Sequence, residues 1–342
     1  MVRSGERRLG EVRMVPRLVF VHGIGPLRDT ERELASWTRS LADGMRAAGH
    51  SAVAERLADG SGLCSFVNYA DLYAPPEAQG SDGTRAEGEA GELLADLLVE
   101  LVDGHLSAQS ASEGPHDRGR ENRAEILAHA RAEADTSGQA QGSLAVLRRA
   151  LNVTTTLMSL KPWGPVAQRV SPKLMVKGLT QVSRYLARGE RDASGLTLDG
   201  RVRNRVHEML GDAPVVVVAH SLGTVVAMEA LHEHQGATPL LVTLGSPISM
   251  RTVVRPRLLP QPPRTPERVG RWLNFWDKDD IIAVRPLLER DVLPNTSGVL
   301  PRSSRVDSDG IWVHSAEKYL AQPAVAGPVA EAFMAAEQRS AP

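Results

Sequence analysis

The chain has 342 residues, of which 42% are hydrophobic and 24% charged, and its formal net charge is −1. This composition is ordinary for a water-soluble globular protein, and the charge gives no global reason to expect nucleic acid as a partner. Cys64 is the single cysteine, so an intrachain disulfide is excluded and a cytoplasmic location is favoured. No apolar stretch is long enough to span a bilayer.

The first 74 residues predict an extension followed by a strand, a helix and a second strand. Residues 1–16 are rich in arginine but lack the apolar segment of a signal peptide, so we expect an N-terminal extension. The apolar run at 18–21 predicts a strand that ends at His22-Gly23-Ile24-Gly25. Residues 29–48 carry apolar side chains at helical spacing, and residues 65–69 predict the next strand.

Residues 75–189 differ in composition from what surrounds them. Gly, Ser, Ala and acidic residues dominate residues 75–142, with an excess of about nine negative charges, and the sign reverses over 143–188. Helical periodicity is present near 92–106 and 121–134, with a flexible tip expected near 107–119. We therefore predict that 75–189 is a helical cap or lid with a flexible acidic part, inserted into a core formed by 17–74 and 190–340.

The second half of the chain alternates predicted helices and strands. A helix is expected near 199–210, and strands are expected at 215–218, 240–244, 271–276 and 310–313. Strands that alternate with helices are typical of a largely parallel sheet covered on both faces. The predicted fold class is therefore α/β.

Ser221 lies at the junction between the apolar run of 215–218 and a helix-compatible stretch that begins at Leu222. Small residues, Ala219 and Gly223, stand two places before and after it. A strained turn that presents a serine between a strand and a helix needs small residues at these two places. The pattern predicts a nucleophile elbow, although an ordinary turn serine that caps the following helix is the alternative.

A serine hydroxyl needs a base, usually a histidine that is oriented by a carboxylate. Asp277, Asp279 and Asp280 follow the strand predicted at 271–276, and His314 follows the one predicted at 310–313. The carboxyl ends of parallel strands are where catalytic groups gather. We expect Asp280 and His314 to be the partners of the serine, with the other two aspartates as alternatives for the acid. His314 also has a purely local alternative, as a residue before a helix.

These residues resemble the α/β-hydrolase superfamily and, within it, the serine lipases and esterases. The order serine, acid, histidine is that family's order. The resemblance implies that Ser221 is the nucleophile, His314 the general base and Asp280 the acid, the last by its match to the lipase pattern Asn-Asp-Ile-Val-Pro. It also implies an oxyanion hole formed by the backbone amides of Ile24 and Leu222.

The resemblance further implies an α/β-hydrolase fold. We expect His22, beside Gly23, to support the loop by hydrogen bonding rather than to carry a proton, and His220 to pack under the elbow or contact the pocket. The resemblance predicts a serine esterase that forms an acyl-enzyme on a small-molecule acyl ester and needs no cofactor and no metal. A peptidase, amidase, thioesterase or acyltransferase on the same residues is an alternative, as is a non-catalytic binding or signalling protein. Basic residues of 143–188 predict a solvated cap face, or alternatively transient contact with anionic lipid.

Overall fold

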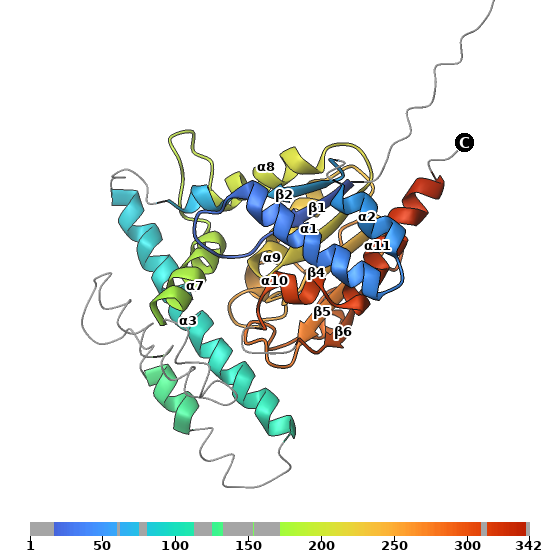
Figure 1. Cartoon of the computed structure of the whole chain (residues 1–342). Helices are drawn as coiled ribbons and strands as arrows, with labels where there is room; N and C mark the ends of the chain where they lie inside the picture. The colour runs from blue at the N-terminus through green and yellow to red at the C-terminus, as the bar shows by residue number, and fades with distance from the viewer. Residues whose placement is uncertain are drawn as a thin grey trace, which may run out of the picture.

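The computed structural model describes residues 17–59, 62–74, 81–112, 125–132, 153, 172–308 and 313–339. Six strands form one sheet in the order β2-β1-β3-β4-β5-β6, and every neighbouring pair is parallel (Figure 1). The predicted α/β class with a parallel sheet is confirmed. The strands are β1 (Arg17–Val21), β2 (Cys64–Val67), β3 (Val215–His220), β4 (Leu240–Leu244), β5 (Trp272–Asp277) and β6 (Pro301–Val306).

Helices cover both faces of this sheet, as Figure 1 shows. Alternate strand residues point to opposite faces, so Leu18 and Phe20 of β1 enter one apolar core while Val19 and Val21 enter the other. The first core is completed by α1 (Thr30–Ala47), α2 (Ser51–Ala58), α10 (Ala316–Leu320) and α11 (Pro323–Arg339). The second is completed by α3 (Ser81–Ser112), α7 (Pro172–Ala187), α8 (Leu198–Leu210) and α9 (Leu222–Glu233). Short 3₁₀ turns are η1 (Ala70–Tyr73), η2 (Arg255–Arg257) and η3 (Leu288–Arg290).

The strand order reverses direction at β1. The chain passes from β1 outward to β2 and then returns to place β3 on the other side of β1. In open α/β sheets such a reversal opens a crevice beyond the carboxyl ends of the two strands, and ligands bind there. The loop after β1 and the turn after β3 therefore lie side by side at the place where the topology favours a site.

The segment between β2 and β3 is tied to the core by its helices. α3 packs along α7 (Figure 1). Glu100 of α3 is buried, and its carboxylate accepts hydrogen bonds from the amides of Thr252 at 3.1 Å and Val253 at 3.0 Å. Asp103 pairs with Arg285 at 3.1 Å. The described part of this segment therefore rests on the loops that follow β4 and β5.

Some predicted boundaries differ from the structure. α3 is longer than the predicted 92–106, so residues 107–112 are helical rather than a flexible tip, and 113–119 lie outside the described residues. Of the helix predicted at 121–134, residues 125–132 are helical and the rest is outside the description. The strand predicted at 310–313 falls mostly on residues outside it, and its last residue, Val313, is not in a strand. The extension 1–16 also lies outside the described residues.

β6 and α2 are among the elements that were not predicted. β6 has exposed and half-buried residues through most of its length, so its sequence lacks the apolar run that marked the other strands. α2 has only 8 residues and follows α1 closely, so its pattern merged with the preceding helix. Of the helices that the structure describes, none has the length and apolar character needed to cross a membrane.

Gly44 marks the closest approach of α1 to the C-terminal helices. A Cβ atom placed there would lie 2.5 Å from the carbonyl oxygen of Leu320 and 2.8 Å from Cβ of Ala326. Gly88 of α3 has nothing within 4 Å of the same position. We predict that Gly44→Ala lowers the free energy of unfolding by about 1–3 kcal/mol, because overpacking outweighs the gain in helix propensity.

Gly88→Ala is the matched control and is expected to raise the free energy of unfolding by about 0.5–1 kcal/mol through helix propensity alone. Urea unfolding of the two variants beside the wild type measures both effects. Equal shifts for the two substitutions would contradict the close packing of α1 on the segment that leads from His314 into α10 and α11.

Candidate active site

Ser221 forms the turn between β3 and α9 in a strained conformation. Its φ is 55° and its ψ is −131°, and a positive φ is uncommon for a residue with a side chain. The turn is held from both sides: the Ser221 amide donates to the carbonyl of Leu244 at 3.0 Å, and the Thr224 hydroxyl donates to the carbonyl of Ser221 at 2.8 Å. Neighbouring structure therefore fixes the serine at the apex.

Two glycines explain why this turn needs small neighbours. A Cβ atom at Gly223 would collide with the backbone carbonyls of Val21 and His22. A Cβ atom at Gly23 would lie 2.5 Å from Cβ of Ser221 and 3.0 Å from its hydroxyl oxygen. The loop after β1 thus passes directly over the elbow. The two glycines are needed because the backbone of this loop and the backbone of the elbow approach each other closely.

Ser221, His314 and Asp280 lie in one chain of hydrogen-bonding groups. Nε2 of His314 is 3.0 Å from Oγ of Ser221, and Nδ1 of His314 is 2.8 Å from Oδ2 of Asp280. The same carboxylate oxygen accepts a hydrogen bond from the Tyr319 hydroxyl at 2.8 Å. The Asp280 side chain is fully buried, while His314 keeps 14% of its side-chain surface exposed. Of these hydrogen-bonded side chains, that of His314 is therefore the one that solvent and ligands reach.

The two alternative aspartates have other partners. The carboxylate of Asp277 accepts hydrogen bonds from the amides of Asp279 at 2.9 Å and Ser308 at 2.5 Å, so it shapes the loops after β5 and β6. The carboxylate of Asp279 pairs with Lys278 at 3.1 Å at the surface. Of the three, Asp280 is the one that contacts His314.

The charge of Asp280 is compensated inside the protein. Burial raises the pKa of this carboxyl, but the charge of His314 and hydrogen bonds from His314, Tyr319 and the Ile282 amide outweigh burial and lower the pKa below its ordinary value. Burial and the neighbouring Asp280 raise the pKa of Tyr319 well above its ordinary value, so its hydroxyl stays a donor. Asp280 therefore remains ionised beside the imidazole.

The loop after β1 is fixed by His22. Nδ1 of His22 lies 2.5 Å from the carbonyl oxygen of Gly23, while Nε2 accepts the amide of Tyr69 at 3.3 Å. The tautomer that satisfies both contacts carries its proton on Nδ1. Burial and the charge of Arg28 lower the pKa of His22 to about 3, which keeps the ring neutral. The ring is also stacked on Tyr69, with centroids 4.1 Å apart.

This arrangement directs the amide of Ile24. The peptide bond is planar and trans, so fixing the Gly23 carbonyl toward His22 turns the Ile24 N–H the opposite way. Within the described residues, neither the Ile24 amide nor the Leu222 amide donates a hydrogen bond to protein. Both therefore have the free donor that a developing oxyanion requires.

His220 lies behind His314 as a packing group. It is buried, its ring centroid is 4.6 Å from that of His314, and it meets Trp37 edge to face at 6.2 Å. Its Nε2 has no hydrogen-bond partner among the residues that the structure describes. Burial and the neighbouring His314 lower the pKa of His220 well below its ordinary value, so a second positive charge beside His314 is avoided.

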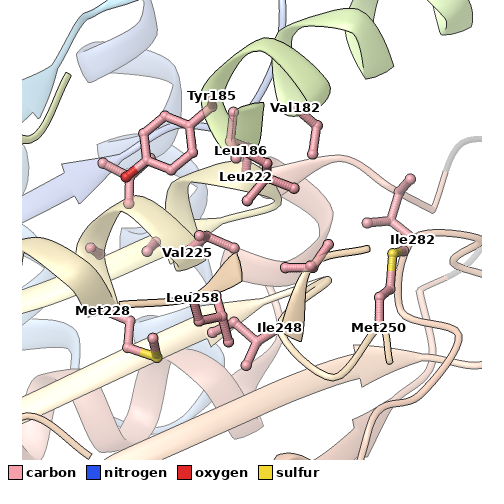
Figure 2. Close-up of a cluster of buried hydrophobic side chains, with 14 of the residues drawn as sticks. Val182, Tyr185, Leu186, Leu222, Val225, Met228, Ile248, Met250, Leu258 and Ile282 are labelled. Atoms are coloured by element: carbon pink, nitrogen blue, oxygen red, sulfur yellow. The ribbon is translucent and has the colours of Figure 1, made fainter. Parts of the chain in front are cut away.

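Apolar side chains surround the first turn of α9. Figure 2 shows Leu222, the residue after Ser221, among side chains from α7 and from the loops that follow β4 and β5. This cluster gives the immediate surroundings of the serine a dry, apolar character, which strengthens electrostatic interactions nearby. The labelled members from these neighbouring elements are Val182, Tyr185, Leu186, Ile248, Met250, Leu258 and Ile282.

Two polar residues around this site, Tyr319 and Gln181, were not predicted from the sequence. Tyr319 follows His314 by five residues, and a tyrosine in a short helix directly after the histidine is its only local signal. Gln181 of α7 contacts the backbone of Gly25, and no motif marks it, because the contact spans 156 positions of sequence. Such contacts are set by tertiary packing.

The described residues contain no group of three or more His, Cys, Asp or Glu side chains placed to hold a metal ion. Comparison with models of known protein families finds no match, and neither the curated proteins nor the solved structures contain one.

The lowered histidine pKa values predict a pH dependence of stability. Between pH 6.5 and pH 3, an unfolded chain protonates His22 while the folded chain keeps it neutral, so stability falls as pH falls through this window. His220 acts in the same direction. Each such group contributes a slope of about 1.4 kcal/mol per pH unit once its unfolded form is protonated.

His220→Phe removes one of these groups, and the absent partner of Nε2 makes an apolar ring acceptable there. Urea unfolding between pH 5 and pH 6 should give the variant a slope lower than that of the wild type by about 1.4 kcal/mol per pH unit. Parallel stability curves for the two proteins would show that His220 is not held neutral in the folded state.

Proposed function

We propose that this chain is a serine hydrolase of the α/β-hydrolase fold that cleaves carboxylic esters through an acyl-enzyme on Ser221. The observation that carries the proposal is the chain of contacts from Asp280 through His314 to Ser221, with distances of 2.8 and 3.0 Å. A positioned acid, base and nucleophile at these distances is the arrangement that activates a serine hydroxyl.

In the proposed reaction, Oγ of Ser221 attacks the carbonyl carbon of the ester as Nε2 of His314 takes the hydroxyl proton. Asp280 holds the other ring nitrogen and stabilises the imidazolium. The amides of Ile24 and Leu222 bind the oxyanion. The C–O bond to the alcohol then breaks, and His314 returns the proton to the leaving alcohol. Water attacks the acyl-enzyme in the same way, and the acid is released.

Two features favour this proposal over a non-catalytic hydrolase-like protein. The strained backbone of Ser221 has a structural cost of roughly 1–3 kcal/mol, and strain of this kind clusters at functional sites. The Asp280 carboxylate is buried where it has no solvent to stabilise it, yet it faces the one ring that contacts the serine. A binding surface requires neither feature.

The proposed machinery consists of Ser221, His314, Asp280 and the amides of Ile24 and Leu222. Esters are favoured because their hydrolysis needs no group beyond this set. Peptidase, amidase, thioesterase and acyltransferase activities use the same residues and remain the alternatives. Several points stay predictions. They are the cap formed by residues 75–189, the cytoplasmic location, the absence of a nucleic-acid partner and a transient contact of the cap with lipid.

Ser221→Ala is predicted to lower kcat for p-nitrophenyl butyrate by at least about 10⁴-fold, because the nucleophile is lost. Ser194→Ala, in the exposed turn that follows Asp192, is the control and should keep wild-type turnover. If the folded wild-type protein hydrolysed p-nitrophenyl esters no faster than Ser221→Ala does, the proposed activity would be refuted.

The assignment of the acid has its own comparison. Asp280→Asn should reduce kcat by about 10⁴-fold, because an amide neither fixes the correct tautomer of His314 nor stabilises its charge. Asp277→Asn should lower stability but leave ester turnover within a few-fold of wild type, since Asp277 contacts loop amides rather than the histidine. Loss of turnover in the Asp277 variant with retention in the Asp280 variant would transfer the role to Asp277.

A further inference from the structure

Gln181 of α7 grips the backbone of the loop after β1. Its side-chain Oε1 accepts the amide of Gly25 at 2.8 Å, and its Nε2 donates to the carbonyl oxygen of Gly25 at 2.8 Å. Two antiparallel hydrogen bonds from one amide side chain fix both the position and the orientation of a backbone residue. Gly25 directly follows Ile24, whose amide is a proposed oxyanion donor.

The peptide units on both sides of Ile24 are then held by separate contacts. His22 holds the carbonyl of Gly23 in the preceding unit. In the following unit, the Gly25 amide donates to Gln181, and Arg28 donates to the carbonyl of Ile24 at 3.0 Å. Gly25 has no side chain that would restrict its rotation, so an external contact must set it. Gln181 supplies that contact by bonding both the amide and the carbonyl of Gly25.

The same helix also braces the second proposed donor. Tyr185 lies one turn after Gln181, and its hydroxyl donates to the buried Oε2 of Glu229 in α9 at 2.7 Å. α9 begins at Leu222, the residue that carries the second proposed oxyanion amide. One face of α7 therefore contacts the loop that holds Ile24 and the helix that begins at Leu222.

Close packing also holds α7 against the side chain of Ile24. A Cβ atom at Gly178, one turn before Gln181, would lie 2.6 Å from Cδ1 of Ile24. The side chain of Ile24 therefore lies directly on α7, next to the hydrogen bonds between Gln181 and Gly25. A helix that is at once in apolar contact with the Ile24 side chain and hydrogen-bonded to Gly25 limits the movement of Ile24, and with it that of the Ile24 amide.

We propose that Gln181 is a positioning residue, which aligns the Ile24 amide with the Leu222 amide for binding the oxyanion. This inference rests on the proposed ester hydrolysis. On this proposal α7, which lies in the segment between β2 and β3, contributes a positioning residue for acylation in addition to covering the sheet. A misplaced oxyanion donor weakens binding of the transition state while leaving ground-state ester binding almost unchanged.

The test compares Gln181→Met, which keeps the length of the side chain but removes both hydrogen bonds, with Thr180→Val on the same helix. The hydroxyl of Thr180 donates within α7, to the carbonyl of Val176 at 2.8 Å, rather than to Gly25. For p-nitrophenyl butyrate we expect the Met variant to lose about 10–100-fold in kcat with KM within about two-fold. Its inhibition constant for an alkyl trifluoromethyl ketone, which forms a serine-bound oxyanion, should rise by the same factor.

Amide hydrogen exchange gives a second readout that does not need turnover. In Gln181→Met, peptides that cover residues 22–28 should exchange faster, while those from β3 should not change. Wild-type kinetics, inhibition and exchange in Gln181→Met would overturn the inference, as would a loss confined to KM with unchanged inhibition. Absence of turnover and of inhibition in the wild type would instead overturn the proposed function, so the two failures are distinguishable.

Discussion

The fold around the site depends on one constrained backbone position, the left-handed turn at Ser221. A residue with a side chain holds this conformation only where its surroundings determine it. Here the Leu244 carbonyl and the Thr224 hydroxyl hold the turn, and two glycines let the neighbouring loop pass over it. The parallel sheet order places that loop beside β3 in the first place. The serine is therefore presented by the topology of the sheet as much as by its own motif.

The second constraint is electrostatic, because the carboxylate of Asp280 is buried without access to water. Its charge is tolerated because a ring nitrogen of His314, the Tyr319 hydroxyl and the Ile282 amide all point at it. These contacts also fix the ring so that its other nitrogen faces Ser221. Around them, burial lowers the pKa values of His22 and His220, so neither ring adds a positive charge beside His314.

The sequence predicted local features well and tertiary ones poorly. The elbow at Ser221 and most strands follow from short apolar runs and small residues, which report on neighbours within a few positions. The preference for Asp280 over Asp277 and Asp279 rested on a match to the lipase pattern, because no local signal shows which carboxylate the loop buries against His314. Tyr319 and Gln181 were missed for the same reason. β6 was missed because an edge strand with exposed side chains lacks the apolar signal.

The central claim is that Ser221 is an activated nucleophile, and covalent labelling tests it most directly. The folded wild-type protein is incubated with an alkyl fluorophosphonate, which transfers its phosphonyl group to an activated serine with loss of fluoride. Intact-mass measurement followed by peptide mapping locates the adduct. We expect one adduct per chain, on Ser221, and none over the same time when Asp280 is replaced by Asn. A folded wild-type protein that stays unlabelled, or one labelled at another residue, would contradict this claim.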